Sequence, residues 1–198
     1  MKSIAALCVA GMLVAGSAHA ADEPEPGSEP IWGPPVAHSL ALFTGMRLTE
    51  AVLWPEPFAR VEPAFWWARY EDAYTLPPKF DPQRAWFEWD GDPWTVNVIG
   101  HGLLGSELYL RARNCRFGWA GSLAFAAGGS LVWEYVFEAN GVRPSAQDLI
   151  YTPLIGFGLG EARFAASRAL RDARGFGAVL RVVLDPFGEA ERALGSVC

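Results

Sequence analysis

The stretch NVIGHGLLGSELYLRAR, residues 97–113, decides the fold of this chain. Asn97, His101, Gly105 and Tyr109 follow one another at intervals of four residues. Because four residues advance about 400° around an α-helix, these positions form one slanting row on a single helix. Most other positions of the stretch are apolar or small. The sequence therefore predicts an apolar helix that carries one polar row, with Glu107 and Arg111 turned toward water.

Two further helices repeat this design. Core helices are predicted over residues 93–113, 117–139 and 144–174. The second and third again space their row residues four apart: Ser130, Glu134 and Glu138, then Asp148, Thr152, Gly156 and Gly160. An unpaired carboxylate in an apolar core is strongly destabilising, so the three rows are expected to meet.

The segment before the core is rich in aromatic residues. Residues 36–53 are predicted to form a further helix, and residues 58–92 an irregular stretch in which residues 64–74 are compatible with a short helix. Seven of the nine tryptophans precede His101. Tryptophan favours boundaries between apolar and wet surroundings, so the stretch is either a lid on the helices or a belt at a membrane surface. The predicted fold is an all-α bundle of four to five helices with an aromatic-rich, irregular N-terminal lid.

The N-terminus has the features of a secretory signal over residues 1–20, with Lys2, an apolar run and a small-residue cleavage site. Residues 21–35 are acidic and proline-rich, which predicts a linker. Residues 36–198 then form a single helical domain with its core at 92–174. Signal removal would leave Cys115 and Cys198, which either pair or stay free in an exported protein.

Composition limits the partners. The net charge of -6 disfavours nucleic-acid binding, which needs a basic face. Residues 117–133 carry no charge and approach the lower length limit of a membrane-spanning helix. We therefore expect an exported protein of the periplasm or cell envelope, with a membrane or envelope lipid surface as its partner. The sequence leaves protein partners open.

The polar rows supply the candidate site. The catalytic candidates can exchange protons: His101, Glu134, Glu138 and Asp148. The binding candidates surround them in the helices: Asn97, Tyr109, Ser130, Trp133, Tyr135 and Glu161. The preferred interpretation is a buried polar network that fixes helix register, in a protein with a structural or ligand-binding role. The alternative is a hydrolase acting on lipid or a related envelope substrate, in which His101 activates Ser130 or a water.

Metal binding is the weaker interpretation. After signal removal only His38 and His101 remain, so the ligands would be mainly carboxylates such as Glu134, Glu138 and Asp148. The Glu-x2-His pattern of di-iron helix bundles is missing. The sequence therefore predicts no metal ion and no cofactor. A small apolar ligand between the helices is a further alternative.

Residues 89–170 resemble DUF3943, a bacterial family of exported proteins of unknown function. The resemblance rests on spaced motifs: Asp92, Asn97-x3-His101-x3-Gly105-x3-Tyr109-x3-Arg113, Ser130-x2-Trp133-Glu134-Tyr135-x2-Glu138, Pro144-Ser145-x2-Asp148-Leu149, Gly156-x3-Gly160-Glu161, and Asp185-Pro186-Phe187 with Arg192. One departure is Gly102, where the family pattern has proline. The resemblance implies a helical cell-envelope protein of a Gram-negative bacterium, and it implies no activity.

Overall fold

The computed structural model describes residues 28–195 and residue 198. The predicted signal peptide, residues 1–20, lies outside the described residues, and so does most of the predicted linker at 21–35. The described part of the chain is helical and contains no strand. The all-α class predicted from the sequence is confirmed.

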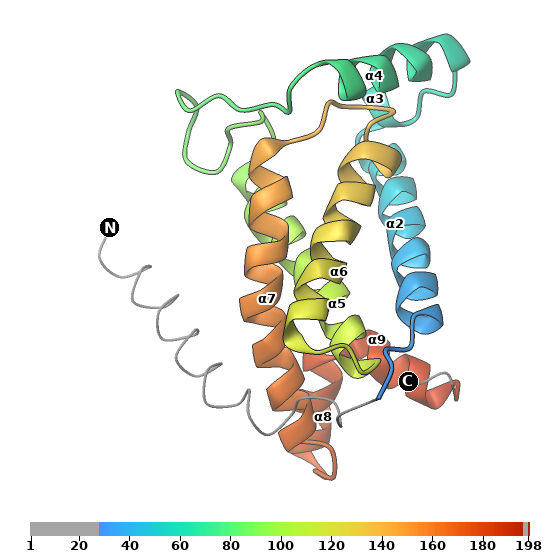
Figure 1. Cartoon of the computed structure of the whole chain (residues 1–198), viewed down its shortest axis with the longest axis vertical. Helices are drawn as coiled ribbons and strands as arrows, with labels where there is room; N and C mark the ends of the chain where they lie inside the picture. The colour runs from blue at the N-terminus through green and yellow to red at the C-terminus, as the bar shows by residue number, and fades with distance from the viewer. Residues whose placement is uncertain (1–27, 196–197) are drawn as a thin grey trace.

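Four long helical segments lie side by side and form the body of the molecule (Figure 1). They are α2 (Gly33–Leu53), η2 (Thr95–Gly100) continued by α5 (His101–Asn114), α6 (Trp119–Val132) continued by η3 (Trp133–Phe137), and α7 (Ala146–Ala169). The segments η2 and η3 are π-helical. Helix α5 is central and contacts α2, α6 and α7. Its position explains why nearly every α5 side chain is buried.

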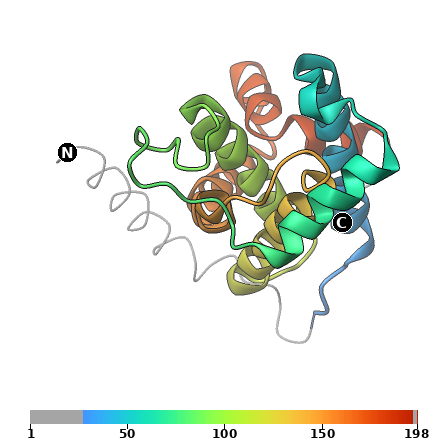
Figure 2. The same cartoon turned by 90° about the horizontal axis from the view of Figure 1, so that it is seen from above.

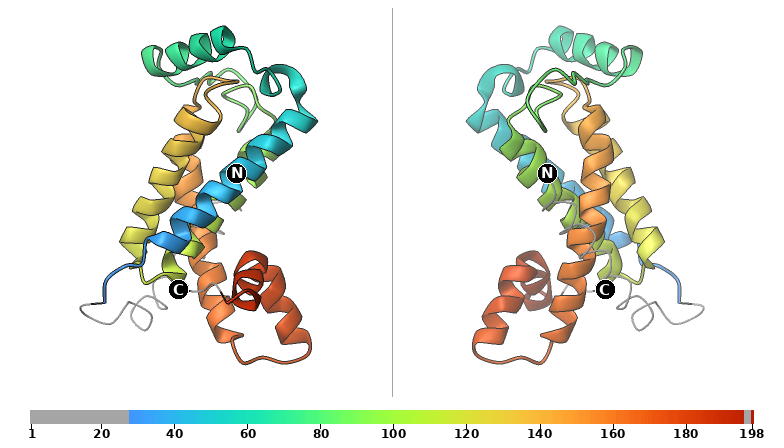
Figure 3. Two further views of the ribbon diagram at one scale, coloured as in Figure 1. Left: turned by 90° about the vertical axis from the view of Figure 1, so that its right-hand side faces the viewer. Right: turned by 90° about the vertical axis from the view of Figure 1, so that its left-hand side faces the viewer.

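Shorter helices close the two ends of the bundle. Helices α3 (Pro55–Phe58) and α4 (Pro63–Thr75) lie at the end where α2 finishes, and α4 crosses that end (Figures 1 and 2). Helices α8 (Phe176–Leu184) and α9 (Pro186–Ala193) lie at the opposite end, beside α7 (Figure 3). We refer to these as the α4 end and the α9 end.

Helix α4 is attached to the bundle by two tyrosines. The hydroxyl of Tyr70 donates a hydrogen bond to the carbonyl of Val136 at 2.6 Å, and Tyr74 donates to the carbonyl of Tyr135 at 2.9 Å. Both acceptors belong to η3. The segment predicted as a lid therefore lies across the bundle, and the short helix considered at residues 64–74 is found as α4.

Two helix boundaries differ from those predicted. Helix α2 begins at Gly33, so the predicted linker is too long; Pro34 and Pro35 fit the first helical turn, where amide donors have no helical partner. Helix α7 ends at Ala169, before the predicted end at residue 174. Its predicted start is confirmed, because the Ser145 side chain caps the helix by accepting from the amide of Asp148 at 3.2 Å.

Glycines allow α5 and α7 to touch backbone to backbone. A Cβ atom at Gly105 would lie 2.0 Å from the carbonyl oxygen of Thr152, and one at Gly156 would lie 2.5 Å from the carbonyl carbon of Gly105. A Cβ at Gly160 would meet the ring of Tyr109 at 2.7 Å. This close approach brings the polar rows of α5 and α7 together.

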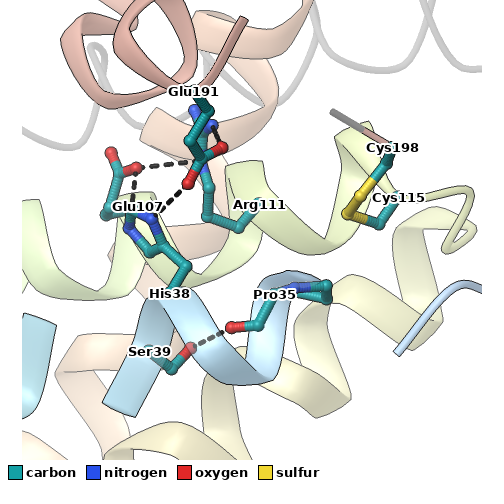
Figure 4. Close-up of a disulfide and its surroundings, with 8 residues drawn as sticks. All are labelled: Pro35, His38, Ser39, Glu107, Arg111, Cys115, Glu191 and Cys198. Atoms are coloured by element: carbon teal, nitrogen blue, oxygen red, sulfur yellow. Dashed lines mark hydrogen bonds and ion pairs between the residues drawn. A yellow bond between two sulfur atoms is a disulfide. The ribbon is translucent and has the colours of Figure 1, made fainter. Parts of the chain in front are cut away.

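Cys115 and Cys198 form a disulfide (Figure 4). Cys115 directly follows α5, and the two cysteines are 83 residues apart in sequence. The bond therefore attaches Cys198 to the end of the central helix and settles the alternative left open by the sequence. None of the described helices is long and apolar enough to cross a membrane.

Candidate functional site

Three polar side chains from three different helices meet near the α4 end. His101 begins α5, Glu134 lies in η3 and Asp148 lies in the first turn of α7. One nitrogen or oxygen atom from each lies within 4.8 Å of the others. Their exposed fractions are 6%, 1% and 2%, respectively. We call these three residues the histidine–carboxylate cluster. The predicted meeting of the polar rows is found here.

Threonine and aspartate of α7 hold the His101 ring. Its Nδ1 lies 3.0 Å from the hydroxyl of Thr152, and its Nε2 lies 3.6 Å from a carboxyl oxygen of Asp148. Thr152 follows Asp148 by one helical turn, so α7 presents both groups on one face. The hydroxyl of Ser130 donates instead to the backbone carbonyl of Asp148 at 3.3 Å. The hypothesis that His101 activates Ser130 therefore gains no support from this geometry.

The carboxyl group of Glu134 is only half satisfied. Its Oε2 accepts from the amide of Ser145 at 2.7 Å. Its Oε1 is buried and has no hydrogen-bond partner among the described residues. Two other buried side-chain oxygens also lack a hydrogen-bond partner among the described residues. They belong to Asn97, four residues before His101, and to Gln147, next to Asp148. Oxygen acceptors without donors thus accumulate around the cluster.

A loop residue missed by the sequence analysis borders the cluster. Asp90 is buried and accepts from the amide of Asn97 at 2.8 Å and from the backbone of Asp92 at 3.0 Å. Asn97 also donates to the carbonyl of Phe87 at 2.9 Å, which fixes the loop to η2. The only signal in the sequence was the Asp90-Gly91-Asp92 turn, which shows no helical spacing.

Burial dominates the electrostatics of the site. Burial raises the pKa of Asp148 to about 9, helped by the charge of Glu134 and a hydrogen bond shared with Asp90. Burial likewise raises the pKa of Glu134 to about 8, although the Ser145 amide opposes this. The pKa of Glu138 is raised in the same way, by burial and by Glu134. Without a cation, these carboxyl groups hold protons at neutral pH.

His101 and Asp90 shift in the opposite direction. Burial lowers the pKa of His101 to about 4, against the influence of Asp90, so its imidazole is neutral at pH 7. Burial alone would raise the pKa of Asp90, but hydrogen bonds from Asp148 and Ser145 bring it below its ordinary value. A neutral imidazole can serve as a metal ligand or a proton acceptor.

Both π-helical segments contribute residues to this region. Segment η2 carries Asn97 and ends where His101 begins α5, while η3 carries Glu134. A π-turn interrupts the regular helical spacing and often occurs at functional sites. The interruption therefore marks the cluster region independently of its residue types.

Four predicted binding residues lie away from the cluster. The hydroxyl of Tyr109 donates to Glu161 at 2.6 Å, and Glu161 also accepts from Arg113 at 2.9 and 3.0 Å. Trp133 is buried and stacks on Phe137. The Tyr135 ring faces Tyr74 of α4 at a centroid distance of 5.6 Å. These contacts describe packing and ion pairing, and a binding role for these residues stays a prediction.

A second group of ionisable side chains, buried or partly buried, lies toward the α9 end. Figure 4 shows His38, Glu107, Arg111 and Glu191 directed toward one another. We call the full set the ion-pair network: His38, Glu107, Arg111, Arg163, Asp185 and Glu191. The prediction that Glu107 and Arg111 face water is wrong, because both are buried. Helices α2, α7 and α9 cover them and supply their partners.

Glu107 is surrounded by two arginines and a histidine. Its carboxyl lies 2.9 Å from Arg111, 2.7 Å from Arg163 and 3.4 Å from His38. Burial would raise the pKa of Glu107, but His38, Arg111 and Arg163 together lower it to about 2. Arg111 also pairs with Asp185 and with Glu191.

The fold and site define an all-α bundle with ionisable groups inside and a histidine–carboxylate cluster near one end. The model of the family described as Domain of unknown function (DUF3943) matches residues 86–187, just over half of the chain. The chain belongs to this family, which confirms the resemblance seen in its motifs. The matched range contains the whole cluster, whereas His38 and Glu191 lie outside it. No curated protein and no solved structure matches the chain.

Proposed function

We propose that this protein is exported to the cell envelope and associates there with a lipid surface through the outer face of its bundle. One observation carries this proposal. The long helices place most of their charged residues inside the bundle, and outside a buried core that includes Leu104, Leu108 and Tyr109 they expose many large apolar residues. This differs from the usual arrangement of a water-soluble protein, in which charged residues are mostly exposed.

Helix α7 shows this difference most clearly. Its acidic residues Asp148 and Glu161 are buried, whereas Ile150 is 63% exposed and Leu154 is 57% exposed. Leu159 is exposed as well. From residue 149 to residue 160 the helix has no charged residue at all. Its outer face is therefore compatible with hydrocarbon.

The other long helices agree. Leu103 of α5 is exposed, while His101, Glu107, Arg111 and Arg113 of the same helix are buried. Leu131, Val132 and Val136 are exposed along α6 and η3. On α2 the exposed large residues are again apolar: Val36, Leu40, Leu48, Val52 and Leu53. Exposed large apolar residues thus occur on all four long segments, and large apolar patches on a protein surface mark interaction or membrane sites.

Exposed tryptophans occur at both ends of this apolar surface. Trp54 follows α2 and Trp94 precedes η2, at the α4 end. Trp32 precedes α2 and Trp119 begins α6, at the opposite end (Figure 1). Tryptophan is enriched where the apolar layer of a membrane meets water. The positions of these rings support lipid association.

Two features support export. Residues 1–20 have the pattern of a secretory signal. The disulfide of Cys115 and Cys198 requires an oxidising environment, which the bacterial periplasm and cell surface provide. The alternative of an envelope hydrolase gains no comparable observation, since His101 is closed to solvent and Ser130 is bonded to a backbone carbonyl.

Vesicle flotation tests the proposal. The purified protein is expected to float with phosphatidylethanolamine–phosphatidylglycerol vesicles. A variant with Leu103→Glu and Leu154→Glu is expected to stay at the bottom, because both side chains are exposed and would place charge in hydrocarbon. The control adds the same charge at exposed polar positions, Thr75→Glu and Gln83→Glu, and is expected to float. Wild-type protein that stays at the bottom, or a Leu103/Leu154 variant that floats like wild type, contradicts the proposal.

A further inference from the structure

We propose that His101, Glu134 and Asp148 bind one divalent transition-metal cation. This inference does not rest on lipid association, because it concerns groups inside the bundle. It also revises the expectation from the sequence, in which no ligand spacing marked a metal site. The ligands come from three helices, so no local motif records them.

The geometry suits a single ion. The three ligand-type atoms lie within 4.8 Å of one another. Metal bonds to imidazole and carboxylate are about 2.0–2.2 Å long, so two ligands of one ion are at most about 4.4 Å apart. Small side-chain rotations would bring all three atoms into bonding range.

The unsatisfied oxygens are the independent observation. Glu134 is 1% exposed, and its Oε1 has no hydrogen-bond partner in the part of the chain that the structure describes. Asn97 is fully buried, and its side-chain oxygen is equally unpartnered there. Buried acceptors without donors are rare in folded proteins and call for a cation or a proton. Glu107 Oε1 and Asp185 Oδ2 of the ion-pair network also lack a hydrogen bond, but they lie 2.9 Å from Arg111 and 3.6 Å from Arg192. In the described part of the chain, Glu134 has no such ion pair, so its acceptor has no cation from the protein.

The contact to Thr152 has a further consequence. Metal-bound histidines usually form a hydrogen bond through the second ring nitrogen, which fixes the ring. In His101, Nδ1 faces the Thr152 hydroxyl at 3.0 Å, and Nε2 is the nitrogen nearer Asp148. The structure thus orients Nε2 as the metal ligand and Thr152 as its positioning partner.

The ligand types define the class of ion. One imidazole and two carboxylates suit Zn²⁺, Fe²⁺ or Mn²⁺, whereas soft ions favour thiolate and thioether sulfur. The two cysteines of the described chain are joined to each other and are not part of the site. Three protein ligands leave room for water or for a further side-chain oxygen, such as that of Asn97.

Isothermal titration calorimetry with Zn²⁺ tests this inference on the full chain after chelator treatment. Wild-type protein is expected to bind one Zn²⁺, and Glu134→Gln and Asp148→Asn are each expected to weaken binding at least tenfold. The matched control is Ser122→Ala, which removes a buried hydroxyl from α6 without touching the cluster. Absence of Zn²⁺ binding to wild type, or wild-type affinity in both ligand variants, overturns the proposal.

Two additional measurements keep the test decisive. Circular dichroism establishes whether each variant is folded. If a variant is unfolded, zinc X-ray absorption of the wild type decides instead, with one nitrogen and at least two oxygen ligands expected. Sulfur ligands or several histidines would contradict the assignment. The Leu103→Glu/Leu154→Glu variant is expected to retain Zn²⁺, so failure of the lipid proposal is distinguishable from failure of this one.

Discussion

In the ion-pair network, Glu107 lies between two arginines and a histidine, all within 3.4 Å. In the histidine–carboxylate cluster, Glu134 is buried just as deeply, but its hydrogen bond comes from a single backbone amide. The pKa values follow these surroundings, since that of Glu107 is lowered to about 2 and that of Glu134 is raised to about 8.

The different surroundings of Glu107 and Glu134 show that one bundle can bury two groups of acidic side chains with different roles. In the ion-pair network, each charge already has its counter-charge within the protein, so the network can stabilise the fold without any ligand. In the cluster, the protein supplies no positive charge beside the carboxyl groups, so a proton or a metal ion has to neutralise them. The network is therefore the structural element, and the cluster is the candidate site.

Removal of an arginine should produce the largest effect. Arg111→Met leaves Glu107, Asp185 and Glu191 without their shared partner, and breaking a buried ion pair costs about 3–5 kcal/mol. Urea denaturation is expected to show this loss in the free energy of unfolding. Arg171→Met, at an exposed position, is the control and is expected to change stability by less than about 0.5 kcal/mol. Similar losses of unfolding free energy in Arg111→Met and Arg171→Met would contradict the structural role of the ion-pair network.

Acid should weaken the network by a somewhat smaller amount. The folded-state pKa of Glu107 is about 2, below its ordinary value of 4.5, so folding favours the ionised form. Its contribution is complete above pH 4.5 and is lost as the pH falls toward 2, with a size of about 3 kcal/mol. Unfolding measured across this range should show the loss in wild type and a flatter profile in Glu107→Gln. Parallel profiles would show that Glu107 is not the responsible group.

The periodic part of the site was predictable from the sequence. His101, Gly105 and Tyr109 share one face of α5 because the α-helical repeat fixes their direction, whatever the tertiary structure. Asn97 lies in the π-helical segment η2, outside this repeat. The same reasoning placed Glu134 and Asp148 on inward rows, since an apolar helix has no other place for a carboxyl group. The meeting of His101, Glu134 and Asp148 follows from these rules.

The remaining features depend on contacts that no local pattern encodes. Asp90 lies in a loop, where the direction of a side chain follows from the turn and not from a repeat. Glu107 and Arg111 were assigned to water because they lie off the polar row, but His38 of α2 and Glu191 of α9 cover them. His38 and Glu191 are 153 residues apart in sequence, so only the folded chain brings them together.

The most direct test compares the free energies of unfolding of wild type, Glu134→Gln and Glu107→Gln. The measurements are made at pH 7 with a chelator present, so that no metal ion is bound. Glutamine keeps the size of the side chain and cannot ionise. At pH 7 it therefore removes the negative charge of Glu107, whereas at position 134 it replaces a protonated, neutral carboxyl. The account predicts that Glu107→Gln loses about 3 kcal/mol, while Glu134→Gln keeps or exceeds wild-type stability because its carboxyl has no counter-charge to lose. Equal losses in the two variants would contradict it and would make the cluster a second structural network.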